Sequence, residues 1–153
     1  MKKFRDLIIL DEMNLVIACD SAGGIGEKPC DEVFANIEMV SYYAAFVPIA
    51  EALCARSVPM VLVDTLCNER EPYGEKIIRG IKMAMSEAGM TSENAFTGSS
   101  EENFLTKMTG IGAGLRMGCF GFFTRGGNGG GDHARRPRLV FGGKTAPEPL
   151  FWR

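Results

Sequence analysis

Residues 14–28, NLVIACDSAGGIGEK, decide the fold, because in them an apolar strand runs through an acid into a glycine-rich turn. Residues 14–20 are apolar up to Asp20, which is typical of a buried strand. The turn contains three glycines, Gly23, Gly24 and Gly26, which predict a loop over 21–31. Their backbone N–H groups, with Lys28, could cradle a phosphate. A plain surface turn explains them about as well, because the segment is neither G-x-x-x-x-G-K-[ST] nor G-x-G-x-x-G.

Helical and extended patterns alternate outward from this segment. Apolar residues at helical spacing predict a helix over 37–55, in which Pro48 either causes a kink or begins a new helix. Pro72 is expected to open a second helix that Gly89 caps. Strands are expected over residues 7–10, 14–20, 59–65, 93–97 and 104–112. This order predicts an α+β or α/β fold with helices packed on a sheet, and it leaves a parallel or a mixed sheet open.

Length and composition indicate one soluble domain. The chain has 153 residues, 46% hydrophobic and 24% charged, which is ordinary for a globular protein. It has no run of 18 apolar residues, so no membrane span is expected. The N-terminus lacks the long apolar region and the cleavage site of a signal peptide, which favours a cytoplasmic protein.

The cysteines and the histidine argue against several kinds of site. The chain has five cysteines, an odd number, and none forms a C-x-x-C pair. A disulfide framework and a zinc site are therefore not expected. Three cysteines fall in apolar segments and are predicted to be small core residues. The single histidine, His133, lies in a glycine-rich stretch and gives little support to a catalytic triad.

The two parts of the chain differ in composition, which suggests a boundary at residue 112. Residues 113–153 contain seven basic and two acidic residues, about +5, whereas residues 1–112 contain 10 basic and 17 acidic residues, −7. Ten of the 19 glycines fall in the last 41 residues, and no periodic pattern is evident after Gly112. Residues 113–153 are therefore predicted to be an irregular or non-native tail, in preference to an RGG-like nucleic-acid-binding segment.

Acidic residues occur at the ends of several expected strands. Asp20 and Asp64 each close an apolar run, and Glu101 and Glu102 follow the expected strand at 93–97. Ligands of α/β sheets bind outside strand ends, and carboxylates beside a glycine-rich loop suit Mg²⁺ and nucleotide phosphates. The alternative for each acid alone is a solvated group or a helix cap.

Taken in chain order, these segments resemble the N-terminal domain of the AIR synthetase (PurM-like) superfamily. Asp20 with the glycines and Lys28 is similar to the family's D-G-V-G-T-K, with a longer spacing. Residues 59–64 are similar to P-L-F-F-L-D, and residues 98–101 resemble G-G-E-T. The segments IACDSAGGIGEK, VSYYAAFVPIAEAL and TGSSEENF resemble the α-ribazole kinase branch more closely. The resemblance covers roughly residues 5–112.

The resemblance implies a mixed sheet with helices on one face, and a homodimer formed through the sheets. It implies ATP and Mg²⁺ as cofactors and an unidentified small-molecule acceptor. The residues implied to hold Mg²⁺ are Asp20, Glu51, Asp64 and Glu101. Those implied to contact the nucleotide are Gly23, Gly24, Gly26, Lys28, Gly98, Ser99, Ser100 and Asn103. No counterpart of the family's second domain is expected in the last 41 residues.

Two functions therefore compete. The first is an ATP- and Mg²⁺-dependent kinase or synthetase for a small molecule, represented here by its nucleotide-binding half. The second is a non-catalytic dimerisation module of the same fold. Nucleic-acid binding through the basic tail is a weaker hypothesis, because the net charge of −7 on residues 1–112 repels a phosphate backbone.

Overall fold

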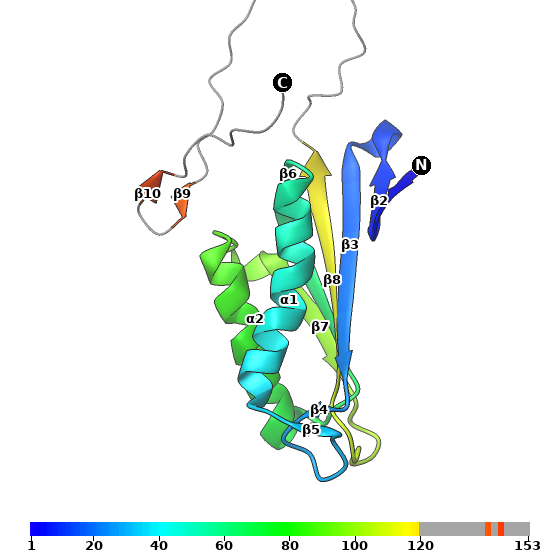
Figure 1. Ribbon diagram of the computed structural model, residues 1–153, viewed down its shortest axis with the longest axis vertical. Helices are drawn as coiled ribbons and strands as arrows, with labels where there is room; N and C mark the ends of the chain where they lie inside the picture. The colour runs from blue at the N-terminus through cyan, green and yellow to red at the C-terminus, as the bar shows by residue number, and fades with distance from the viewer. Residues whose placement is uncertain (120–139, 142–143, 146–153) are drawn as a thin grey trace, which may run out of the picture. The chain divides into compact units, whose positions relative to one another are not determined.

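The computed structural model describes residues 1–119, 140–141 and 144–145, and its main feature is one mixed six-stranded sheet (Figure 1). The strands run in the order β1-β2-β3-β8-β6-β7. Their bounds are Lys2–Phe4 (β1), Leu7–Leu10 (β2), Leu15–Gly23 (β3), Gly110–Cys119 (β8), Ser57–Leu66 (β6) and Phe96–Ser100 (β7). Only the β6–β7 pair of this sheet is parallel. The mixed sheet is thus confirmed.

Two helices cover one face of the sheet (Figure 1). They are α1, Ile37–Cys54, and α2, Glu75–Glu87. The Asn36 side chain accepts a hydrogen bond of 3.0 Å from the Met39 backbone N–H and so caps α1. Helix α1 runs through Pro48 without ending, so this proline does not begin a new helix.

Shorter elements connect these parts. They are the short parallel pair β4 (Ile25–Gly26) and β5 (Val33–Phe34), single turns at Asp11–Met13 and Glu93–Ala95, and the π-type turn Arg70–Gly74 that leads into α2. The expected strand over 93–97 therefore begins only at Phe96. A separate two-stranded pair consists of β9, Val140–Phe141, and β10, Lys144–Thr145.

The two helices approach closely at Gly80 of α2. A Cβ atom at Gly80 would lie 2.0 Å from the Glu38 carbonyl oxygen and 2.2 Å from Ser41 Oγ of α1. Glycine is required there, although alanine is the better helix former. The predicted cap of α2 is confirmed. Gly89 has φ +77°, and the N–H groups of Gly89 and Met90 bond back to Ser86 and Met85.

Helix α1 is long and apolar enough to cross a membrane by length and composition, with a mean hydropathy of 1.3. That test also selects core helices of soluble proteins. The side of α1 that faces the sheet is in the hydrophobic core and includes Ile37, Ala44, Ala45, Ile49 and Ala52. Packing on the sheet therefore accounts for much of its apolar composition.

Strand β8 corrects the expected domain boundary. It runs to Cys119 in the middle of the sheet, pairing with β3 on one side and β6 on the other. The boundary at residue 112 is wrong, since residues 113–119 belong to the sheet, and residues 104–109 are not a strand. Ile111, Ala113, Leu115 and Met117 are buried, and glycines between them conceal this alternation in the sequence. Apart from β9 and β10, the remainder of the expected tail lies outside the described residues.

The prediction of three core cysteines is wrong, since four of the five, Cys19, Cys30, Cys54 and Cys67, are exposed. Cys19 alternates with the buried Ala18 and therefore lies on the sheet face opposite the helices. Composition of the surrounding segment could not reveal which face each residue occupies.

Candidate nucleotide and metal site

Two of the predicted acids lie in one row across the sheet. Asp20 of β3 pairs with Ala113 of β8, Ala113 pairs with Asp64 of β6, and Asp64 pairs with Gly98 of β7. Each acid lies two residues from a buried residue of its strand, Ala18 for Asp20 and Leu62 for Asp64, so both are on the face covered by the helices. Neighbouring strands are about 4.8 Å apart, which places the two Cα atoms about 10 Å from each other. Only the methyl group of Ala113 stands between the carboxylates in this row.

Asp64 is the most buried acid of the row, with 3% of its surface exposed. Burial raises the pKa of its carboxyl group to about 6, although the Ser99 backbone N–H and the nearby Arg70 act in the opposite direction. Its carboxylate occupies the space that a side chain at position 98 would need. A Cβ atom on Gly98 would lie 1.3 Å from Asp64 Oδ1. Glycine at 98 is therefore required for this placement of Asp64.

A small pocket of about 70 Å³ lies beside Asp64. It is lined by Asp64, Leu66, Arg70, Ile78, Phe96, Gly98, Ser99 and Ser100. These residues come from the ends of the two parallel strands, from the turn before α2 and from α2 itself. Carboxyl ends of parallel strands are a common place for ligands in sheets with helices. A space of this size suits an ion or a phosphate-sized group with water, since one water takes about 30 Å³.

The loop after β7 positions the other polar residues that the sequence predicted. Ser99 and Ser100 line the pocket, and the Ser100 hydroxyl donates a 2.6 Å hydrogen bond to Glu102. Glu101 Oε1 accepts hydrogen bonds from the backbone N–H and the side-chain amide of Asn103, at 2.8 and 2.7 Å. Glu101 Oε1 and the Asn103 amide groups thus use their hydrogen-bonding capacity on each other within one turn.

Glu51 does not join Asp20 and Asp64. It lies fourteen positions after Ile37, the first residue of α1, or about 21 Å along the helix. Figure 1 shows α1 starting beside β4 and β5, at the end of the sheet where β3 finishes, and running away from it. Glu51 Oε2 is buried there without a hydrogen-bond partner among the described residues. No group of three or more His, Cys, Asp or Glu side chains placed to hold a metal occurs in the described part of the chain.

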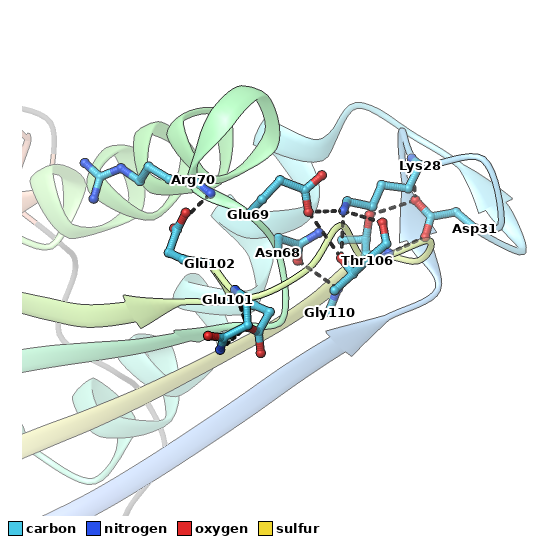
Figure 2. A network of polar contacts seen from close by, with 11 residues as sticks. Lys28, Asp31, Asn68, Glu69, Arg70, Glu101, Glu102, Thr106 and Gly110 are labelled. Carbon is cyan, nitrogen blue, oxygen red and sulfur yellow. Dashed lines mark hydrogen bonds and ion pairs between the residues drawn. The ribbon is translucent and has the colours of Figure 1, made fainter.

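Lys28 is held inside the fold (Figure 2). Its side chain is 0% exposed, and its ammonium group lies 2.5 Å from Glu69 Oε2. It also donates to the Thr106 carbonyl and hydroxyl oxygens, both at 2.7 Å, and lies 4.9 Å from the centre of the Tyr73 ring. Burial raises the pKa of the Glu69 carboxyl group, but the hydrogen bond from Lys28 and other bonds outweigh this effect and hold it below its ordinary value.

The glycine-rich turn is hydrogen-bonded to residues 106–109. The Gly24 N–H donates to the Thr109 carbonyl at 2.9 Å, and the Cys30 N–H donates to the Lys107 carbonyl at 3.1 Å. A Cβ atom at Gly26 would lie 2.3 Å from Thr109 Oγ1, so glycine is required for this close approach. Gly24, with φ +69°, makes the turn itself. Much of the hydrogen-bonding capacity of this turn is therefore used within the fold, and Gly23 continues the pairing of β3 with β8.

The Asp31 side chain also connects the glycine-rich turn to Thr109. Its carboxylate accepts hydrogen bonds from the Thr109 N–H and hydroxyl, both at 2.7 Å, and from the Lys28 N–H at 2.9 Å. Burial raises the pKa of Asp31, yet these bonds outweigh it and hold the pKa below its ordinary value. Sequence reasoning missed Asp31 and Glu69, and it missed Asn68, which is completely buried. The only available signal was the pair of polar residues Asn68 and Glu69 after an apolar strand.

Comparison with solved structures identifies the architecture. The chain matches thiamine monophosphate kinase from Aquifex aeolicus with a TM-score of 0.55 at 15% identity, over 76% of this chain and 38% of that one. It matches the AaThiL structure complexed with AMPPCP and TMP with a TM-score of 0.50 at 14% identity, over 72% and 34% of the two chains. The fold is that of the PurM-like N-terminal domain. The chain thus spans little more than a third of these proteins.

No protein-family model matches the sequence, and no curated protein matches it. The recognised similarity therefore concerns the fold. The predicted metal and nucleotide residues remain predictions, of which Asp20 and Asp64 share a row and Gly98, Ser99 and Ser100 share the pocket with Asp64.

Proposed function

We propose that this chain is the nucleotide-binding part of an ATP- and Mg²⁺-dependent enzyme that phosphorylates or activates a small molecule. The observation on which the proposal rests is the row formed by Asp20, Ala113, Asp64 and Gly98, beside a pocket lined by Ser99 and Ser100. The pocket combines the Asp64 carboxylate, the polar residues Ser99 and Ser100 and the cationic Arg70 in a space of phosphate size.

The donor set fits Mg²⁺. This ion binds oxygen ligands, and it commonly uses one or two carboxylates together with waters and substrate phosphates. Asp20 and Asp64 would be the carboxylates, and Glu51 and Glu101 are not needed for such a site. Because the pKa of Asp64 is about 6, most Asp64 side chains are ionised at pH 7 and ready to bind a cation. When bound, Mg²⁺ neutralises charge on the transferred phosphate.

The other residues would orient the nucleotide. The Ser100 hydroxyl, which donates to Glu102 in this structure, would turn to donate to a phosphate oxygen, and Arg70 at the pocket wall adds a positive charge. Catalysis of phosphoryl transfer is mainly positioning and charge stabilisation, which such groups can supply. Support from similar proteins is the nucleotide AMPPCP in the matching AaThiL structure. The match covers only 34% of that protein, so the acceptor and the complete reaction are part of the proposal.

The test is isothermal titration of the purified chain with ATP, with and without Mg²⁺. We expect Mg²⁺-dependent binding that Asp64→Asn and Asp20→Asn each weaken at least about tenfold, because charged ligands of a cation contribute strongly. Glu93→Gln is the control, since this exposed acid lies outside the row. Equal affinity in all four proteins, or binding that ignores Mg²⁺, contradicts the proposal.

A specific observation also favours the second function, dimerisation. The sheet face opposite the helices exposes apolar residues, namely Ile8, Ile17, Val58, Met60 and Val63, each between 37% and 49% exposed. In β8 the same face bears Gly112, Gly114 and Gly118, with the exposed Arg116 between the last two. A sheet face of this kind is usually buried against another layer. We propose that two copies pair through it, and this pairing is compatible with nucleotide binding on the opposite face.

Light scattering tests the dimer. Wild type is expected at twice the monomer mass, and Val63→Arg at the monomer mass with unchanged circular dichroism, because a charge cannot be buried unpaired in the interface. Val33→Arg is the matched control, as Val33 is 53% exposed but lies in the separate β4–β5 pair. A monomeric wild type at micromolar concentration refutes the dimer.

A further inference from the structure

The ammonium group of Lys28 has no hydrogen left for a ligand. A lysine ammonium has three N–H donors. In this protein three oxygens accept from it: Glu69 Oε2, the Thr106 carbonyl oxygen and Thr106 Oγ1. With a side chain that is 0% exposed and a cationic group over the Tyr73 ring, Lys28 is enclosed on several sides.

The partners of Lys28 lie in loop 101–109, which follows the pocket, or next to a residue that bonds to both ends of that loop. Glu69 follows Asn68, whose carbonyl accepts from the Glu101 N–H at 3.0 Å, where the loop begins. Asn68 Oδ1 accepts from the Gly110 N–H, also at 3.0 Å, where the loop ends and β8 begins. Thr106 lies between these points (Figure 2). One buried ion pair and one buried amide thus connect the end of β6 to the start, middle and end of loop 101–109.

We propose that Lys28 is a positioning residue, whose buried pair with Glu69 fixes loop 101–109 and thereby the pocket residues Ser99 and Ser100 that precede it. The inference rests on the proposed function for its effect on nucleotide affinity. It replaces the direct phosphate contact that the sequence suggested for Lys28. The glycine-rich turn then serves to bring Lys28 and Asp31 to this loop, which agrees with its hydrogen bonds to Thr109 and Lys107.

A double-mutant cycle on Mg²⁺·ATP affinity separates the two roles. If the pair positions the loop, Lys28→Met and Glu69→Gln each weaken binding by a similar factor, on the order of tenfold, and the double variant is no weaker than either single variant. If Lys28 contacts phosphate, Lys28→Met weakens binding in both backgrounds, while Glu69→Gln alone does not weaken it. That second pattern overturns the proposal.

Hydrogen exchange of the nucleotide-free protein provides a readout that does not depend on ATP. Amides of residues 101–110 are expected to exchange about tenfold faster in Lys28→Met and in Glu69→Gln than in wild type, with helix amides unchanged. Thr106→Val removes the two hydrogen bonds of the Thr106 hydroxyl but leaves the Lys28–Glu69 ion pair in place. It should give a smaller change in the same residues, and it shows whether the charge variants act through global unfolding. Lys3→Met is the control for loss of a lysine, since Lys3 is exposed on the edge strand β1.

Unchanged exchange in residues 101–110 in all three variants overturns the positioning role. This result is distinct from failure of the proposed function, in which the wild type binds no ATP although the exchange pattern of the loop still responds to the variants.

Discussion

Replacing Asp64 by asparagine should make the protein more stable at neutral pH. The folded-state pKa of Asp64 is about 6, against an ordinary value of 3.8. The folded protein therefore holds a proton that the unfolded chain has already lost between these two values, and stability falls as the pH rises through this window. At about 1.36 kcal/mol for each pH unit between the two pKa values, the cost above pH 6 is about 3 kcal/mol. Asparagine has nearly the same shape and no charge, so it avoids this cost.

The measurement is urea unfolding of wild type and Asp64→Asn between about pH 3.5 and pH 8, a range that includes both pKa values. The difference in unfolding free energy should be near zero at the acid end, grow between about pH 4 and pH 6, and stay near 3 kcal/mol above it. Glu93→Gln, which removes an exposed charge, controls for the change in net charge.

Two results would refute this reasoning. The first is a variant that is less stable than wild type at pH 8, which means that the charged Asp64 is stabilised by partners stronger than Ser99 and Arg70. The second is a stability difference that does not vary with pH. If the prediction holds while the variant loses Mg²⁺-dependent ATP binding, Asp64 reduces stability at a site where ligand binding needs a charge.

The remaining predictions concern packing and capping, and each is measured by chemical unfolding. Gly98→Ala should destabilise the protein by about 1–3 kcal/mol, because the new Cβ atom would lie 1.3 Å from Asp64 Oδ1. Gly23→Ala is its matched control and should have little effect, since nothing lies within 4 Å of that Cβ position. Gly80→Ala should also destabilise, by about 1–3 kcal/mol, against the helix preference for alanine; a stabilised variant would mean that α1 and α2 separate easily. Asn36→Ala should cost about 1 kcal/mol through loss of the cap on α1, and an unchanged stability contradicts that role.

Much of the secondary structure follows from the sequence, because short-range patterns determine it. Apolar residues at helical spacing predicted α1 nearly to the residue, and Gly89 predicted the end of α2 because only a residue that tolerates positive φ fits there. The extent of β8 was missed. Alternate glycines contribute no hydrophobic signal, although Ile111, Leu115 and Met117 still recur at every second or fourth position.

What the sequence by itself determined is therefore both long helices, most strands of the large sheet, the acid at the end of each apolar run and the resemblance that named the fold. Only the tertiary structure decided which of those acids meet. Strand register placed Asp20 and Asp64 in one row, while Glu51 lies far along α1 and Glu101 bonds to its own turn. It also placed Lys28 beside Glu69, 41 residues away in the chain. The physical reason is that pairing register and buried ion pairs depend on contacts between distant segments, which no local pattern of residue types records.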